Sequence, residues 1–200
     1  MGKMRQGMLM LLWLAFILSP VLSEQGSMMD ELSVMSVSEE CGKWRINFNW
    51  SDMDEYKSSV SQGESASGNT EVATDTLILS SSTGRDNVLK LSVITYSRSD
   101  PSQVSMSTMI GLANGTLVKS GVCREIDLAG RMIDGKQGVF ASGLKCPTNE
   151  TVYVAVYPVE YHLDRPGGVL ESNAIGLILS TYDRDVTERF VSSVDIQQIK

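Results

Sequence analysis

The sequence predicts an α+β domain built mainly on an antiparallel sheet of about six to eight strands, with one internal amphipathic helix and one short helix near the C-terminus. Several segments alternate apolar and polar residues with the period of two that is typical of half-buried strands. One segment instead has apolar residues at helical spacing, and a short helix-like segment precedes the C-terminus. Short turn sequences join the strand-like runs, which favours antiparallel neighbours.

Composition limits the possible functions. The 200 residues are 42% apolar and 20% charged, so the chain can bury a core and wholesale disorder is excluded. The net charge is −7. Because phosphate backbones and anionic lipid surfaces repel a net anion, we expect no nucleic-acid partner and no membrane binding through a basic face.

The N-terminus has the pattern of an export signal. Lys3 and Arg5 precede an apolar run, and Val21-Leu22-Ser23 suits a cleavage site, so residues 1–23 are predicted to be a signal peptide. The alternative is a retained membrane anchor. Its apolar run would rise only about 22 Å as a helix, against a hydrocarbon core of about 30 Å. We therefore expect an exported protein, extracellular or associated with the cell envelope, that contacts the membrane only through an uncleaved N-terminal segment.

The first half of the mature chain contains three strand candidates. Residues 24–40 lack a clear period and are predicted to be a flexible tether to a single domain, residues 41–200. Residues 58–70 are rich in serine and glycine and are predicted to be a mobile loop. The expected strands are residues 44–50, 71–81 and 88–97.

An amphipathic helix is expected next. Asp100-Pro101 offers an N-cap and a first helical residue, and Asn114-Gly115 a stop. Its apolar positions are Met106, Met109, Ile110 and Ala113. Methionine at this spacing indicates core packing rather than a soft-metal site.

A long hairpin follows the helix. Asp134-Gly135 favours a two-residue turn between strands at 122–133 and 136–145. In that register one face, which the sheet is expected to bury, contains Ile126, Leu128, Met132, Val139 and Ala141.

The C-terminal part continues the strand pattern. Strands are expected at 151–163 and 173–182, around a loop at 164–168. Asp185 and Glu188 suggest a capping box for a short helix, and Val194-Asp195-Ile196 a terminal strand.

Export makes the three cysteines candidates for a disulfide. The two-residue turn places Cys123 opposite Cys146, within reach of a bridge. Cys41 is then either a buried thiol or a competitor for one of the other two. Sequons at Asn49, Asn114 and Asn149 are compatible with glycosylation.

Motifs for catalysis are weak. His162 is the single histidine, and no Gly-x-Ser-x-Gly nucleophile elbow accompanies it, so a structural role is favoured. The carboxylates at 52–55 and 183–185 do not follow a calcium-loop pattern. The sequence therefore predicts no catalytic residue, no metal site and no cofactor.

The C-terminal pattern carries a family resemblance. Its parts are the Asp134-Gly135 hairpin with Lys136 and Gly138, a long strand ending in Tyr157-Pro158, a strand into Ser180-Thr181-Tyr182-Asp183, a short helix and a terminal Val194-Asp195-Ile196. This series resembles the PsbP-like and LpqN-like group of exported α+β domains, and is similar to secreted proteins of uncertain role in methanogenic archaea. The resemblance implies an antiparallel sheet flanked by helices, and a role in binding or assembly rather than catalysis.

Two hypotheses for function follow. The first is a non-enzymatic exported domain that docks on an envelope protein assembly or binds a small ligand. The second is an extracytoplasmic hydrolase with a site around His162, Asp164 and Arg165.

Overall fold

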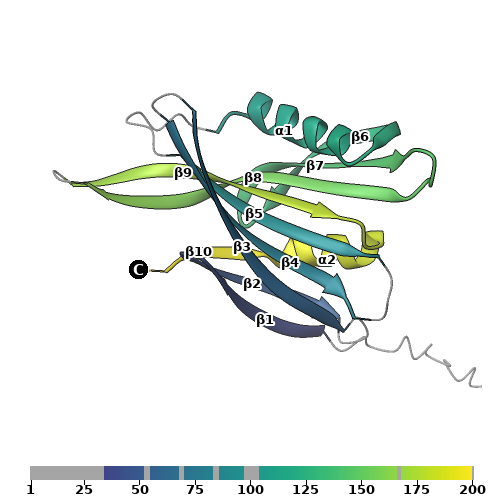
Figure 1. The fold of residues 1–200 in the computed structure, drawn as a ribbon, viewed down its shortest axis with the longest axis horizontal. Helices are drawn as coiled ribbons and strands as arrows, with labels where there is room; N and C mark the ends of the chain where they lie inside the picture. The colour runs from purple at the N-terminus through teal and green to yellow at the C-terminus, as the bar shows by residue number, and fades with distance from the viewer. Residues whose placement is uncertain are drawn as a thin grey trace, which may run out of the picture. The chain divides into compact units, whose positions relative to one another are not determined.

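A seven-stranded antiparallel sheet forms the middle layer of the fold (Figure 1). The computed structural model describes residues 34–51, 55–67, 70–82, 86–96, 104–165 and 168–199, so the predicted signal peptide and the first part of the tether lie outside the described residues. The sheet order is β3 (Tyr56–Ser67), β4 (Thr70–Ser81), β5 (Val88–Tyr96), β9 (Gly168–Ser180), β8 (Thr151–Arg165), β7 (Lys136–Lys145) and β6 (Val122–Ile133).

A smaller sheet and two helices complete the described part of the chain. The small sheet has the order β1 (Val34–Cys41), β2 (Trp44–Ser51) and β10 (Asp195–Gln198), and all its pairings are antiparallel. The helices are α1 (Met106–Lys119) and α2 (Arg184–Ser193). The α+β class with a mainly antiparallel sheet and two helices is confirmed. The described residues form ten strands rather than the predicted six to eight.

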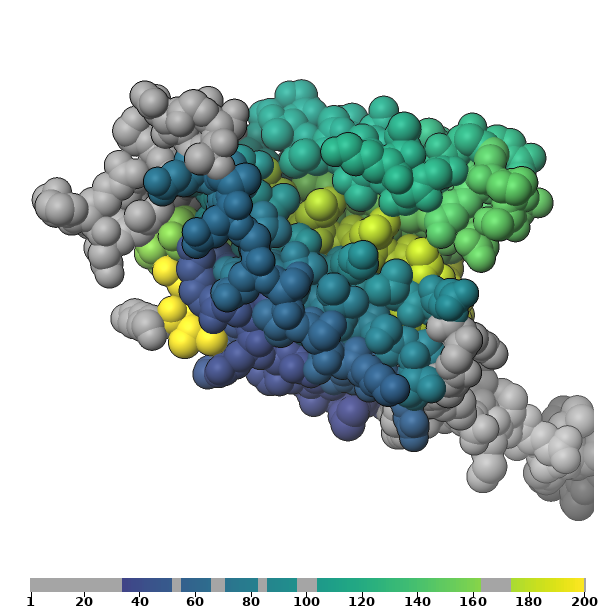
Figure 2. All heavy atoms as spheres, in the orientation of Figure 1, coloured from purple at the N-terminus to yellow at the C-terminus, as the bar shows by residue number. Residues whose placement is uncertain are grey.

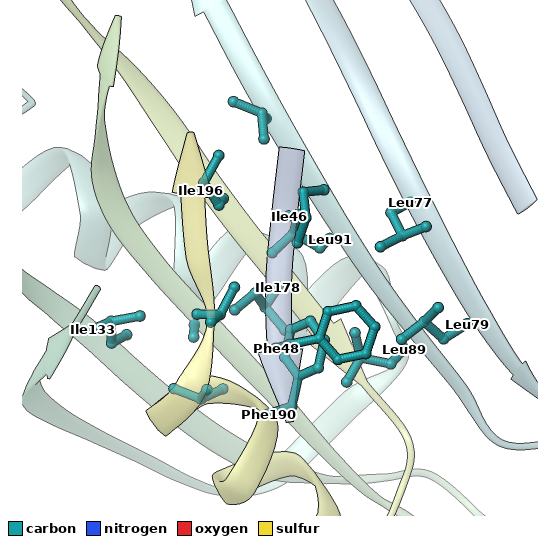
Figure 3. Packing of buried hydrophobic residues seen from close by; sticks show 14 of the residues in the cluster. Ile46, Phe48, Leu77, Leu79, Leu89, Leu91, Ile133, Ile178, Phe190 and Ile196 are labelled. Atoms are coloured by element: carbon teal, nitrogen blue, oxygen red, sulfur yellow. The ribbon is translucent and has the colours of Figure 1, made fainter. Parts of the chain in front are cut away.

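The small sheet and α2 cover one face of the large sheet. Apolar side chains of β2 alternate inward and meet those of β4, β5 and β9. Figure 3 shows Phe48 pointing from β2 toward Leu89 of β5, with Phe190 of α2 beside it. The rings of Phe48 and Phe190 are 4.8 Å apart, and Trp50 packs edge-on against Tyr182 at 5.3 Å. This aromatic cluster joins the two sheets.

Helix α1 covers the opposite face. Its buried residues Met109, Ala113 and Leu117 follow the helical repeat and pack on alternate residues of β7, β8 and β9. Along β8, Val154 and Val156 face α1, whereas Ala155 and Tyr157 face the small sheet. The large sheet is therefore buried on both faces near its centre.

Two segments predicted to be irregular form strands. Part of the tether is β1, which pairs with β2 along its whole length, from Val34–Ser51 to Cys41–Trp44. Most of the predicted loop at 58–70 is β3, which pairs with β4 from Tyr56–Ser81 to Ser67–Thr70. Serine-rich sequence has low intrinsic strand preference, and here the neighbouring strand supplies the backbone hydrogen bonds.

Both helices begin at residues other than those predicted. The N-cap of α1 is Ser105, whose hydroxyl accepts from the Thr108 amide, and the helix continues through Asn114-Gly115 to Lys119. Burial of Leu117 beyond that dipeptide outweighs its poor helix propensity. The N-cap of α2 is Asp183, whose carboxylate accepts from the Val186 amide, rather than Asp185.

The expected buried face of the long hairpin is only half buried. Val139 and Ala141 of β7 lie under α1, but Ile126, Leu128 and Met132 of β6 are 42%, 39% and 62% exposed. The register does place Leu128 opposite Ala141. The prediction of burial is wrong because β6 is an edge strand of the described sheet and α1 packs mainly on β7 and β8.

The Asp134-Gly135 turn is confirmed. Both residues have positive φ, 51° and 68°, as a type I′ turn requires, and Ile133 pairs with Lys136. The register holds from there to Asp127–Ser142 and then shifts at bulges near Glu125, whose φ is 52°.

The structure pairs Cys123 with Cys146 at disulfide distance, with their Cα atoms 6.0 Å apart. The reasoning from a continuous register is wrong, because the bulges bring Val122 opposite Lys145 and leave Cys146 just beyond β7. Cys41 is a buried free thiol.

The bridge closes a loop with a sequence separation of 23. A loop of this size contributes roughly 3 kcal/mol by constraining the unfolded chain, which corresponds to a change in Tm of roughly 6 to 12 °C for a domain of this size. We expect Cys123→Ser, Cys146→Ser and the double variant to lower Tm by the same amount, because each removes one bond. Non-reducing peptide mapping provides the direct check, and a bridge that contains Cys41 would contradict the pairing.

Candidate functional site

Among the described residues β6 pairs only with β7, and its other edge is an exposed strand edge with apolar character. Residues 123–130 are all exposed, although both ends of the strand, Val122 and Ile133, are buried. Ile126, Leu128 and Met132 lie on the face that also contains α1. An unpaired edge presents a row of backbone N–H and C=O groups to any strand that docks on it.

The opposite edge of the same sheet is different. Strand β3 presents serines, Lys57 and Glu64, and Val60 is its one exposed large apolar residue. Figure 2 shows the blue atoms of β3 lying open on the surface. Polar and charged residues on an edge discourage docking of another strand. The β6 edge is therefore the better binding surface of the two.

A small cleft lies beside the β6 edge on the face that contains α2. Its volume is about 190 Å³. The Arg131 guanidinium lies over the Phe140 ring at 5.2 Å, donates to Ser192 Oγ at 2.8 Å, and is 3.8 Å from a Glu188 carboxylate oxygen. These contacts hold the guanidinium over Phe140 of β7 and beside α2. The remaining lining residues are Asp127, Ala129, Gly130, Ser142, Tyr153 and Arg184.

A second, polar cleft of about 540 Å³ lies where the Asp134-Gly135 turn meets β8 and β10. Lys136 is the cation here, 4.0 Å from the Asp134 carboxylate and 3.6 Å from that of Glu160. Asp195 adds a third carboxylate, which accepts from Asn47 at 3.0 Å. The other lining residues are Gly135, His162, Ile196, Gln197 and Gln198.

His162 lines this cleft, but its hydrogen bonds run through its backbone. Its amide donates to Gln198 Oε1 at 2.8 Å, and its carbonyl accepts from Gln198 Nε2 at 3.0 Å. The Gln198 amide group thus occupies the place of a neighbouring strand along this part of β8. This contact favours a structural role for the backbone around His162. The sequence alone could not predict the contact, because the two residues are 36 positions apart.

The other sequence-predicted residues are dispersed. Backbone pairing places Asp164 and Arg165 at the end of β8, opposite Val169 and Gly168 of β9, so the described residues of the predicted loop at 164–168 belong to strands. Asp183 caps α2. Among the described residues no group of three metal-ligating side chains is close enough to hold an ion, and no helix is long and apolar enough to span a membrane.

The three sequons occupy different surroundings. Asn114 is exposed on α1, and Asn149 lies in an exposed turn with φ 59° and accepts from Arg124. Asn49 is half-buried on β2, and the Ser51 of its sequon is buried. Glycosylation stays a prediction, and the exposed turn at Asn149 suits it best.

Burial raises the pKa of two groups, the buried thiol of Cys41 and the half-buried carboxyl of Asp134. Burial raises the pKa of the Cys41 thiol to about 11, and the negative charge of Asp75 adds to the shift. Cys41 is therefore protonated and unreactive at neutral pH. Burial likewise raises the pKa of Asp134, although the Lys136 charge and the Ile196 amide act in the opposite direction.

The raised pKa of Asp134 predicts a pH-dependent effect of Asp134→Asn. In the wild type, the contribution of the Asp134 carboxyl to the free energy of unfolding is most favourable below its unfolded-state pKa of about 3.9. This contribution is lost as pH rises through the raised folded-state pKa. Asparagine avoids this loss and suits a type I′ turn. We expect the variant to have the higher Tm at pH 7, with the difference narrowing toward pH 3.

Thermal melts at pH 3 to 7 measure this difference. Glu160→Gln is the matched control, because Glu160 contacts the same lysine but its side chain is 75% exposed. A Tm gain for Asp134→Asn that is larger at pH 3 than at pH 7 would contradict the assignment.

Comparison of the chain with protein-family models, with curated proteins and with solved structures finds no match. The resemblance to PsbP-like and LpqN-like domains therefore stays a prediction. The function has to be inferred from the two surfaces described above.

Proposed function

We propose that this chain is an exported, non-enzymatic domain that acts by binding and assembly at the cell envelope, and that the β6 edge is its binding surface. The observation that carries this proposal is the exposure of Ile126, Leu128 and Met132 along a strand edge. An incoming strand would gain backbone hydrogen bonds from the edge and side-chain contacts from the apolar residues. The net charge of −7 supports a protein partner over a nucleic acid.

The surroundings of β6 suit a docking strand. The bulges near Glu125 end the regular ladder, so the segment available for pairing is residues 126–133. The β6–β7 turn fixes one end of that segment, and the paired Cys123 and Cys146 hold the other. A rigid edge loses little conformational entropy when a partner docks.

A photo-crosslinking amino acid at position 128 tests the proposal in cells that express the full chain. We expect Leu128 to give discrete covalent adducts with protein, because it lies on the docking edge. Ser61 on the exposed β3 edge is the matched control and should give few. Equal adduct patterns at the two positions would overturn the proposal.

The polar cleft favours a second function, the binding of a small polar ligand. Asp134, Glu160 and Asp195 line the cleft with three carboxylates, and Lys136 lies within 4.0 Å of the first two, so the cleft suits a ligand that carries an amine or guanidinium group. The alternative of an extracytoplasmic hydrolase places a site around His162, which lines this cleft.

Activity measurements distinguish a domain that only binds from a hydrolase. The purified chain is assayed on generic ester, peptide and glycoside substrates beside His162→Ala and Ser61→Ala. We expect only background turnover from all three, because the His162 contacts are structural. Turnover that His162→Ala abolishes and Ser61→Ala retains would establish the hydrolase instead.

A further inference from the structure

The backbone N–H and C=O groups of β6 point alternately to β7 and to the free edge. A two-residue turn is closed by a hydrogen-bonded pair, here Ile133 and Lys136. Because hydrogen-bonding direction alternates along a strand, residues 127, 129 and 131 direct their backbone groups to β7. Residues 128, 130 and 132 direct theirs to the free edge. A docking strand must therefore pair with these even-numbered residues.

The sequence of β6 is self-complementary in one antiparallel register. We propose that the β6 edge pairs with β6 of a second copy of this chain, about a twofold axis at Ala129; this inference rests on the proposed binding role of the edge. In this register Leu128 and Gly130 form the hydrogen-bonded pairs at the centre. The two sheets then continue into one another across the axis.

Charge complementarity selects this register. Asp127 of each copy lies directly opposite Arg131 of the other, which gives two oppositely charged cross-strand pairs. Shifting the register so that the axis passes through residue 127 or 131 would instead place like charges opposite each other. With the axis at residue 128 or 130, Asp127 faces Ala129 or Ile133 and the charge pairs are lost.

The apolar residues agree with the same register. Ile126 of each copy lies opposite Met132 of the other, on the face that contains α1. Because a twofold axis perpendicular to the sheet keeps each face on its own side, the apolar residues of both copies adjoin. Arg131 and Asp127 line the same small cleft on the face that contains α2, where the Arg131 guanidinium contacts Phe140, Glu188 and Ser192.

The β3 edge offers no comparable match. Its exposed residues are mostly serine, and Lys57 and Glu64 lie seven positions apart with Val60 between them. Self-pairing through β3 would gain little apolar burial. The structure therefore favours one edge over the other for contact between copies.

A cysteine at the axis tests the register. Ala129 would face its own copy as a non-hydrogen-bonded pair, with Cα atoms about 4.5 Å apart, close enough for Ala129→Cys to form an intermolecular disulfide. We expect the full chain with Ala129→Cys to convert mostly to a covalent dimer under mild oxidation, at least several-fold faster than Ser61→Cys on β3. Peptide mapping should place the bridge between the two introduced cysteines.

Gly130→Pro provides the disrupting variant. It removes an amide that points to the free edge, so the β6–β7 ladder is retained while each of the two central Leu128–Gly130 pairs loses one intermolecular hydrogen bond. Added to Ala129→Cys, it should reduce cross-linking several-fold with little change in Tm. Light scattering of the otherwise unmodified chain should show twice the monomer mass at high micromolar concentration, and the monomer mass with Gly130→Pro.

Equal cross-linking of Ala129→Cys and Ser61→Cys, or a monomeric mass at high concentration, would overturn self-pairing. The photo-adducts at Leu128 then distinguish the two failures. Adducts of a mass other than that of two chains would leave the binding role of β6 standing with a different partner. Absence of both dimer and adducts would overturn the binding role as well.

Discussion

The aromatic contact between the two sheets holds together segments that lie far apart in the sequence. Phe48 and Trp50 come from β2, Phe190 from α2 and Tyr182 from the turn before α2. Their packing fixes β2 against the large sheet and brings β10, near the C-terminus, into register beside it. Because buried aromatic side chains contribute large apolar areas, this cluster accounts for much of the core on that face. This contact therefore determines where the small sheet packs on the large sheet.

The coverage of the large sheet determines which surface remains open. The small sheet and α2 occupy one face, and α1 occupies the other over β7 and β8. One helix is too narrow to shield the neighbouring edge strand as well. Ile126, Leu128 and Met132 are consequently exposed although their residue types suit a core. The same geometry that stabilises the domain thus leaves β6 available for another strand.

The polar cleft arises from the meeting of a local turn with distant strands. Asp134 lies in a type I′ turn, and its carboxylate accepts from the Ile196 amide of β10 at 3.5 Å. Gln198 of the same strand binds the backbone of His162 in β8. Side chains of Asp134 and Gln198 therefore bind backbone groups at this meeting point of the two sheets. The raised pKa of Asp134 reflects the burial that this arrangement imposes.

The sequence by itself determined the features that depend on neighbouring residues. The alternation in Trp44–Trp50 identified β2, and Asp134-Gly135 identified the turn, because side-chain period and positive φ are local properties. The hairpin brought Cys123 near Cys146, but the bulges that set their actual register have no clear signal in the residues. Only the tertiary structure decided that serine-rich residues 56–67 form a strand, that α1 continues through Asn114-Gly115, and that β6 is an open edge. These outcomes depend on hydrogen bonds and burial supplied by partners elsewhere in the chain, which no local pattern encodes.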